Sequence, residues 1–160
     1  MSVIPKVNSP KQMNWMKKHK YFELDEFIAS DVAKKKKIDN TPTFEAVANL
    51  EELVENILDP LRAAYGMPIK VTSGYRCAEL NKAVGGVVGS VHQLGHAADL
   101  QVGGSFSKFK TFVVEWLKKS GVRFDQCLLE RNTKTGAQWI HIATRNALGQ
   151  QRGQIKVLNV

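Results

Sequence analysis

The spacing of the apolar residues changes along the chain, and this change limits the fold more than any other feature of the sequence. Between Phe44 and Tyr65 apolar residues recur every three or four positions, which predicts an amphipathic helix that Pro60 kinks or divides. A second helix is predicted for residues 107–119. Four segments have the pattern of strands and lie mainly in the second half: 68–72, 96–102, 124–130 and 138–144. Helices first and strands later predict an α+β fold, a small antiparallel sheet flanked by helices.

Shorter signals complete the expected fold. One short helix is expected within residues 21–33 and another over residues 78–83. Thr43 has the residue type and position of a helix N-cap, and Gly66 is expected to end the long helix. The polar segment 131–137 suits a hairpin turn, so the last two predicted strands should pair with each other.

The length of 160 residues predicts one domain, which we place at residues 21–160 behind a basic lead-in, residues 1–20. A hydrophobic fraction of 43% and a charged fraction of 24% are typical of a soluble globular protein. A core of this size needs no disulfide or structural metal, so any bound metal is expected to do chemistry. Cys77 and Cys127 have no C-x-x-C spacing and are interpreted as two buried or half-buried thiols, although the sequence leaves their pairing open.

The net charge of +8 indicates an anionic partner, and both nucleic acid and the bacterial envelope carry such charge. Two lysine clusters, within residues 17–20 and 34–37, lack the interleaved aromatic residues of a nucleic-acid stacking surface. We therefore interpret both as solvated basic faces, and we expect His19, which lies within the first cluster, to be exposed. The first 16 residues have no apolar run of signal-peptide length, and no stretch of 18 apolar residues occurs. We accordingly expect synthesis in the cytoplasm and no membrane span.

Three residues have the chemistry of a metal site. His92 lies in a glycine-containing loop, and Asp99 follows on a predicted strand. The small residues Gly95, Ala97 and Ala98 between them would let the loop fold back, so that both side chains point at one spot. His141 lies on a later predicted strand that could run beside the first. A catalytic zinc ion needs three such nitrogen or carboxylate ligands and one open position. Each residue alone has an ordinary explanation, a hydrogen-bonded core histidine or an aspartate that caps a turn, so the combination carries the prediction.

The residues around these three form a recognisable pattern. Residues 90–99 read S-x-H-x-x-G-x-A-x-D, residues 73–76 read S-G-Y-R with Leu80-Asn81 after them, and the closing hairpin contains W-I-H at residues 139–141. The pattern resembles the zinc D-alanyl-D-alanine carboxypeptidase and dipeptidase family, in particular its phage and Bacteroides branch. That family includes phage endolysins and vancomycin-resistance dipeptidases, and hedgehog signalling domains share its fold. The resemblance covers residues 21–145.

This resemblance implies a role for each matching residue. His92, Asp99 and His141 would bind one Zn²⁺ ion, which activates water at neutral pH. Arg76 would stabilise the developing oxyanion or hold the substrate carbonyl, and Ser90 would bind the substrate carboxylate or steady its loop. Two histidines and one carboxylate also suit iron, so the choice of zinc depends on the resemblance.

The general base is where the sequence departs from the family pattern. Many relatives carry an acid three residues before the last histidine, but this chain has Gln138, whose amide cannot accept the proton. We predict Glu130 as the base, because pairing of the last two strands would place it opposite Trp139 at the mouth of the site. Asp125 is a second candidate, and loss of catalysis is a third outcome. His96 is expected at the rim of the site and not as a ligand.

Three functions follow from these observations. The first is a zinc metallopeptidase that hydrolyses a peptide bond in bacterial peptidoglycan, as a D-Ala-D-Ala carboxypeptidase or an endopeptidase. It would be a monomer acting on the cell wall, with a phage lysis enzyme or tail lysin favoured over a bacterial cytoplasmic dipeptidase. The second is an inactive zinc-containing module that binds the cell wall, which Gln138 favours. The third is a basic nucleic-acid-binding protein with incidental histidines, which leaves the signature unexplained.

Overall fold

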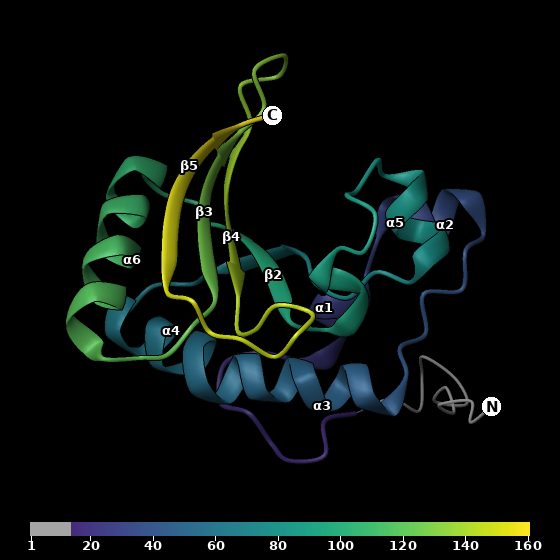
Figure 1. Cartoon of the computed structure of the whole chain (residues 1–160), viewed down its shortest axis with the longest axis horizontal. Helices are drawn as coiled ribbons and strands as arrows, with labels where there is room; N and C mark the ends of the chain where they lie inside the picture. Colours follow the sequence, from purple (N-terminus) through teal and green to yellow (C-terminus); the bar gives the residue numbers. More distant parts are fainter. Residues whose placement is uncertain (1–13) are drawn as a thin grey trace.

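The computed structural model describes residues 14–160, which form a five-stranded sheet with helices around it (Figure 1). The helices are α1 (Leu24–Ile28), α2 (Asp31–Lys36), α3 (Phe44–Leu53), α4 (Asp59–Tyr65), α5 (Ala78–Ala83) and α6 (Phe106–Ser120), with a π-helical turn η2 (Val54–Leu58) and a 3₁₀ turn η3 (Val91–Leu94). The strands are β1 (Lys70–Ser73), β2 (Ala97–Gln101), β3 (Gln126–Arg131), β4 (Gln138–Ala143) and β5 (Gln154–Asn159).

The sheet has the strand order β1-β2-β4-β3-β5. Every neighbouring pair is antiparallel except β3 and β5, which are parallel. The α+β fold with a mainly antiparallel sheet is therefore confirmed, including the predicted hairpin of β3 and β4. The sequence analysis did not predict the edge strand β5.

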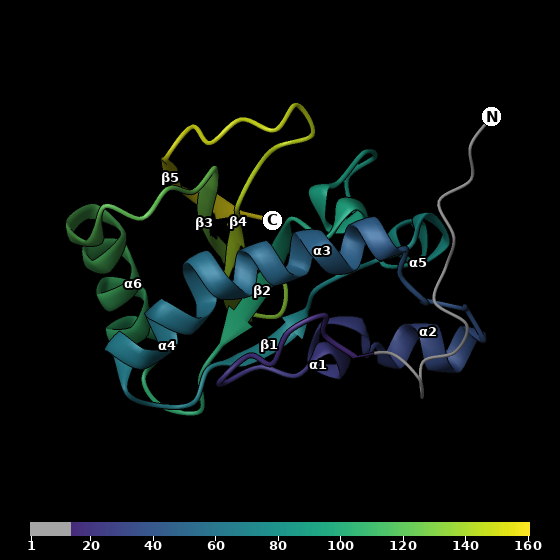
Figure 2. The ribbon, with the colours of Figure 1, turned by 90° about the horizontal axis from the view of Figure 1, so that it is seen from below.

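Helices cover the sheet on different sides. Figure 1 shows α6 on one side of the strands, α5 with η3 on the other, and α3 with α4 beneath them. In Figure 2, which is seen from below, α3 and α4 cross in front of the strands. Side chains alternate between the faces of a strand, so β4 turns Ile140 and Ile142 into the core while His141 points to the opposite face. The core lies between the sheet, α6 and the α3–α4 helix, which leaves the opposite face of the sheet available for a site.

The long predicted helix is divided near Pro60, as expected. Proline has no N–H to donate and its ring crowds the carbonyl four residues earlier, which lies within the π-helical turn η2. Thr43 accepts a hydrogen bond from the Ala46 N–H at 3.1 Å, which confirms the predicted cap, and Gly66 ends α4 with a φ of 78°. Phe44 was expected in the apolar stripe, but it begins the helix and is 52% exposed.

The segment from residue 21 to residue 36 forms two helices, where one was expected. Ser30 separates them and caps α2 by accepting a hydrogen bond from the Ala33 N–H at 3.2 Å. Three lysines, Lys34 to Lys36, fill the last turn of α2 and are exposed. Cations are favoured at this end of a helix because its free carbonyl groups carry partial negative charge. The lysine run is therefore an exposed helix end.

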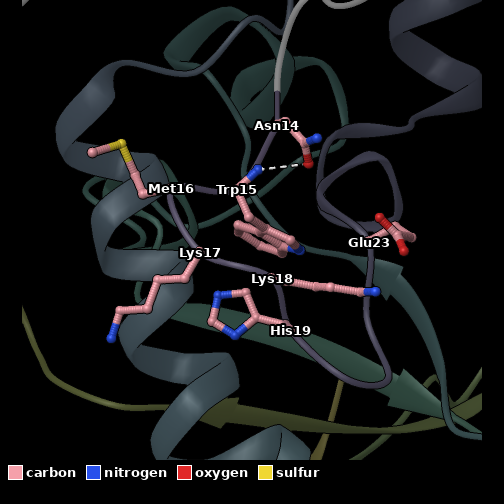
Figure 3. Close-up of a pocket in the computed structure, with 7 residues that line it drawn as sticks. All are labelled: Asn14, Trp15, Met16, Lys17, Lys18, His19 and Glu23. Atoms are coloured by element: carbon pink, nitrogen blue, oxygen red, sulfur yellow. Dashed lines mark hydrogen bonds between the residues drawn. The ribbon is translucent and has the colours of Figure 1, made fainter.

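The chain before α1 packs on the helix that follows Thr43. Trp15 donates from Nε1 to the Phe22 carbonyl at 2.8 Å and is buried. His19 was expected to be exposed, but it is 8% exposed, with its Nε2 3.3 Å from Glu51. The Trp15 and His19 rings meet edge to face, and both line a pocket that also includes Glu23 (Figure 3). Contacts with α3 therefore bury a histidine that local sequence would leave in solvent.

Part of the predicted lead-in, residues 1–13, lies outside the described residues. Within residues 14–160, no helix combines the length and the apolar character needed to span a bilayer. Cys127 is buried, Cys77 is partly buried, and both thiols are free. Burial raises the pKa of the Cys127 thiol to about 12, so this side chain behaves as a small apolar core residue.

Candidate metal centre

Three side chains from different elements converge on the face of the sheet away from α6. The pairing of β2 with β4 sets Asp99 directly beside His141, and η3 brings His92 over them. The atoms that face one another are 3.0 Å apart for His141 Nδ1 and Asp99 Oδ1, 3.2 Å for His92 Nε2 and His141 Nδ1, and 3.3 Å for His92 Nε2 and Asp99 Oδ1. Within residues 14–160, this is the one group of three residues with metal-ligand chemistry at such distances.

A hydrogen bond at Nδ1 determines which ring nitrogen of His92 carries the proton. Nδ1 lies 2.6 Å from the Gly74 carbonyl, which can only accept, so Nδ1 carries the hydrogen and donates it. In the neutral ring Nε2 then has a bare lone pair. That lone pair faces the Asp99 carboxylate and the His141 ring nitrogen. Three electron-rich atoms at such distances repel one another unless a cation or an added proton lies among them.

The chain folds this way because two glycines allow close backbone contacts. A Cβ atom on Gly74 would lie 2.6 Å from the Phe27 Cα, so only glycine lets this strand end pass α1 and present its carbonyl to His92. Gly95 has a φ of 79°, and a Cβ there would lie 2.3 Å from the Ala46 carbonyl oxygen in α3. The glycines of the S-G-Y-R segment and of the ten-residue signature therefore shape the loop that carries His92.

The donor set fits a zinc ion. Zinc ligands at about 2.0–2.1 Å in a tetrahedron are separated from one another by about 3.3–3.4 Å, close to the spacing of these three atoms. Burial alone would raise the pKa of Asp99, but the adjacent His92 and His141 rings outweigh it and hold the pKa below its usual value. The carboxylate is therefore ionised and able to bind a cation throughout the neutral range.

Glu130 lies at the mouth of the same site. The hairpin pairs it with Trp139, as the sequence predicted, and the Trp139 indole N–H donates to its Oε2 atom. Burial, and after it the negative charge of Asp99, raise the pKa of Glu130 above the usual glutamate value. A carboxylate with a raised pKa is a better proton acceptor, which is the property a general base needs.

Position 138 and the second candidate base, Asp125, both lie away from the cluster. Gln138 is exposed, and the alternation along β4 points it away from the face that carries Trp139 and His141. An acid at position 138 would therefore not face the cluster in this fold. Asp125 is buried and accepts two hydrogen bonds from the Arg152 guanidinium at 2.8 and 2.9 Å, so its carboxylate is already engaged.

Arg76 and Ser90 meet beside the cluster. Arg76 donates from Nη2 to Ser90 Oγ at 3.5 Å, and Ser90 Oγ also accepts from the His92 N–H at 3.2 Å. Burial lowers the pKa of Arg76, while the negative charges of Asp99 and Glu130 act in the opposite direction. Its Nε atom is buried without a hydrogen-bond partner among the described residues. A buried guanidinium N–H of this kind is available to a substrate oxygen.

These side chains line one cleft of ≈ 570 Å³, within the size range of small-molecule and peptide sites. All six predicted site residues line it: Arg76, Ser90, His92, Asp99, Glu130 and His141. His96 does not line it, and its Nδ1 is buried without a partner among the described residues. Leu158 and Val160 also line the cleft and were not among the predicted site residues. The signal that could have found them is the apolar, valine-rich composition of residues 155–160, which is typical of a strand.

The comparison with known families agrees with this geometry. The family model described as peptidase M15 matches residues 20–143, which is more than half of the chain. No curated protein matches the chain. The matched range includes the three clustered residues, Arg76 and Glu130, and it ends before β5.

Proposed function

The chain belongs to the peptidase M15 family, and on that premise we propose that it is a zinc-dependent peptidase that hydrolyses a peptide bond in bacterial peptidoglycan. The observation that carries the proposal is the convergence of three donor atoms, from His92, Asp99 and His141, beside a carboxylate whose pKa is raised. One face of one cleft thus holds ligands for a metal and a proton acceptor, the two requirements of metal-assisted hydrolysis.

His92, Asp99 and His141 would hold the ion. When bound, zinc supplies a Lewis acid that makes water nucleophilic at neutral pH and polarises a carbonyl group. The hydrogen bond from Nδ1 to the Gly74 carbonyl keeps the Nε2 lone pair of His92 facing Asp99 and His141, where it would bind the metal. The ligand set itself is rigid because Asp99 and His141 are adjacent on paired strands.

Glu130 and Arg76 act on the substrate side of the cleft. Glu130 takes the proton of the attacking water and later gives it to the leaving amine, since one carboxyl group can serve as base and then as acid. The Trp139 indole orients the carboxylate for this transfer. Arg76 donates to the carbonyl oxygen as negative charge develops on it, and its buried environment strengthens that interaction. Ser90 steadies the loop and the guanidinium.

The partner that fits is the peptide part of the cell wall. The net charge of +8 favours approach to the carboxylates and phosphates of the bacterial envelope. We propose that the protein acts as a monomer, in a phage lysis or tail-associated role. Cleavage within a peptide chain and removal of a terminal D-alanine use the same ligand set and remain two forms of this proposal.

Glu130→Gln separates a peptidase from an inactive binding module. The two side chains have the same shape, but the amide cannot accept a proton. We expect kcat to fall by about 10²–10⁴-fold, the usual contribution of a general base, with the zinc content unchanged. Gln138→Glu is the control, because the exposed side chain at position 138 lies on the opposite face of β4 and should leave kcat unaltered.

Each outcome has a distinct meaning. Equal turnover by the wild type and Glu130→Gln would remove Glu130 from the mechanism. Stoichiometric zinc in both proteins with turnover in neither would favour the binding module. Restored turnover on combining Glu130→Gln with Gln138→Glu would show that position 138 reaches the cluster, against the strand alternation described above.

A further inference from the structure

β5 brings a leucine next to Glu130. In the parallel register of β3 and β5, Leu158 pairs with Glu130, and side chains paired in this way share a face of the sheet. His141 lies on the same face, because it is two residues after Trp139, the partner of Glu130 on β4. Leu158 and Val160 both line the cleft of the His92–Asp99–His141 cluster. One wall of the cleft is therefore apolar and comes from β5.

This wall is fixed at both of its ends. At the start of β5, the Gln154 N–H donates to the Asp125 carbonyl at 2.9 Å, and the Arg152 side chain binds the Asp125 carboxylate. At the far end, the Val160 N–H donates to the Arg131 carbonyl at 2.9 Å, and the Thr133 N–H donates back to the Val160 carbonyl at 2.9 Å. Leu158 thus lies between two anchored points, which preorganises it for contact with a ligand.

A second segment also contributes apolar residues to the cleft. Val84 and Val87 line the cleft from the glycine-containing loop after α5, and they are 40% and 79% exposed. Asn81 holds this loop by donating from Nδ2 to the Val87 carbonyl at 2.9 Å and accepting from the Gly86 N–H at 2.8 Å with its own carbonyl. Glycine at position 86 lets the Asn81 side chain keep this place, because a Cβ there would lie 2.2 Å from Asn81 Oδ1. The lining of the cleft therefore contains apolar side chains from two separate segments besides the polar cluster.

We propose that β5 is part of the substrate-binding site and that Leu158 determines specificity by holding a short apolar side chain of the peptide next to the bond that is cut. The inference rests on the proposed peptidase function and adds a binding contact to it. β5 lies beyond residues 20–143, so this wall is outside the part of the chain that matches the family. Leu158 is only 41% exposed and close to Glu130 in register, so a bound peptide covers it together with the base.

The test compares two substitutions on neighbouring residues of β5. Leu158→Ser removes the proposed contact. Val157→Ser is the matched control, because Val157 is 75% exposed, does not line the cleft and points to the other face of the strand. The probe is a peptidoglycan stem pentapeptide that ends in D-Ala-D-Ala, presented to the zinc-loaded full chain. KM and kcat are measured by amine release, and Kd is measured by calorimetry.

Leu158→Ser should raise KM and Kd about tenfold, which corresponds to losing roughly half of the burial of one leucine side chain, with kcat unchanged. Val157→Ser should leave all three constants at wild-type values. Equal Kd values for the three proteins, or no binding by any of them, would overturn the inference. If the wild type binds the pentapeptide but cuts neither it nor purified peptidoglycan, the proposed peptidase function fails, and the Kd comparison still decides the role of Leu158.

Discussion

Replacing Gly95 by alanine tests how the loop carrying His92 is shaped. The new Cβ would lie 2.3 Å from the Ala46 carbonyl oxygen and 3.0 Å from the Ala46 carbonyl carbon, both backbone atoms of α3. A backbone in a buried helix cannot turn aside as a flexible side chain can. The residue also has a φ of 79°, a conformation that costs a non-glycine residue about 1–2 kcal/mol.

Gly89→Ala is the matched control for this substitution. Gly89 has a φ of 74° in the same loop, but a Cβ there would meet nothing within 4 Å. Both substitutions carry the same backbone strain and the same loss of unfolded-state entropy, so their difference isolates the contact with α3. Overpacking of this kind costs about 1–3 kcal/mol, so we expect Gly95→Ala to lower the free energy of unfolding by about 2–4 kcal/mol and Gly89→Ala by about 1 kcal/mol.

Urea unfolding of the metal-free proteins measures this difference directly, and thermal unfolding gives a second reading. For a chain of this size each kcal/mol shifts Tm by about 2–4 °C, so Gly95→Ala should melt at a Tm lower than that of Gly89→Ala by at least about 2 °C. Zinc affinity should fall in Gly95→Ala as well, because the loop positions His92. Equal stability of the two variants would refute the argument that contact with α3 requires glycine at position 95.

Three further predictions concern the metal, the pH and the glycine loop. Zinc at about a thousand times its Kd should stabilise the wild type by about 4 kcal/mol, seen as a rise in Tm, and should not shift the Tm of His92→Ala. Hydrogen bonds from Arg152 lower the pKa of Asp125 in the folded protein. The stability that Asp125 contributes is therefore fully present above the pKa of the carboxyl in the unfolded chain, and it is lost as the pH falls through the pKa of the folded state. The difference in urea midpoint between wild type and Asp125→Asn should therefore be full at neutral pH and vanish in acid; a difference that grows in acid would contradict this sign. Asn81→Ala should release the loop carrying Val87 and so raise KM for the pentapeptide, while the zinc content stays at one ion per chain. Loss of zinc would show instead that the loop also supports the metal ligands.

The features that local sequence predicts are those with local causes. The π-helical turn next to Pro60, the cap at Thr43 and the end of α4 at Gly66 follow from the chemistry of single residues; an irregularity at Pro60 and the other two features were predicted. The pairing of Glu130 with Trp139 follows from one short hairpin. The approach of Asp99 to His141 required β2 and β4 to be neighbours, which the family pattern suggested and periodicity alone did not.

The features that the sequence analysis missed depend on distant partners. β5 is held by β3 across a parallel pairing, so nothing near residue 154 shows which strand it joins. His19 is buried by Glu51, 32 positions away, and its basic neighbours in sequence gave the opposite expectation. Asp125 stayed a candidate base because its partner Arg152 is 27 positions later in the sequence, and nothing near Asp125 shows that the two residues meet. Tertiary contacts determine the environment of such residues, and the local sequence pattern does not show those contacts.

We propose above all that the His92–Asp99–His141 cluster holds the metal ion with which this protein cuts peptidoglycan. Mass spectrometry of purified peptidoglycan after incubation with the zinc-loaded protein tests it most directly, with His92→Ala alongside. New fragments should appear with the wild type and none with His92→Ala, and the fragment masses identify the bond. No fragments from several wall types, in a sample with one zinc ion per chain, would contradict it.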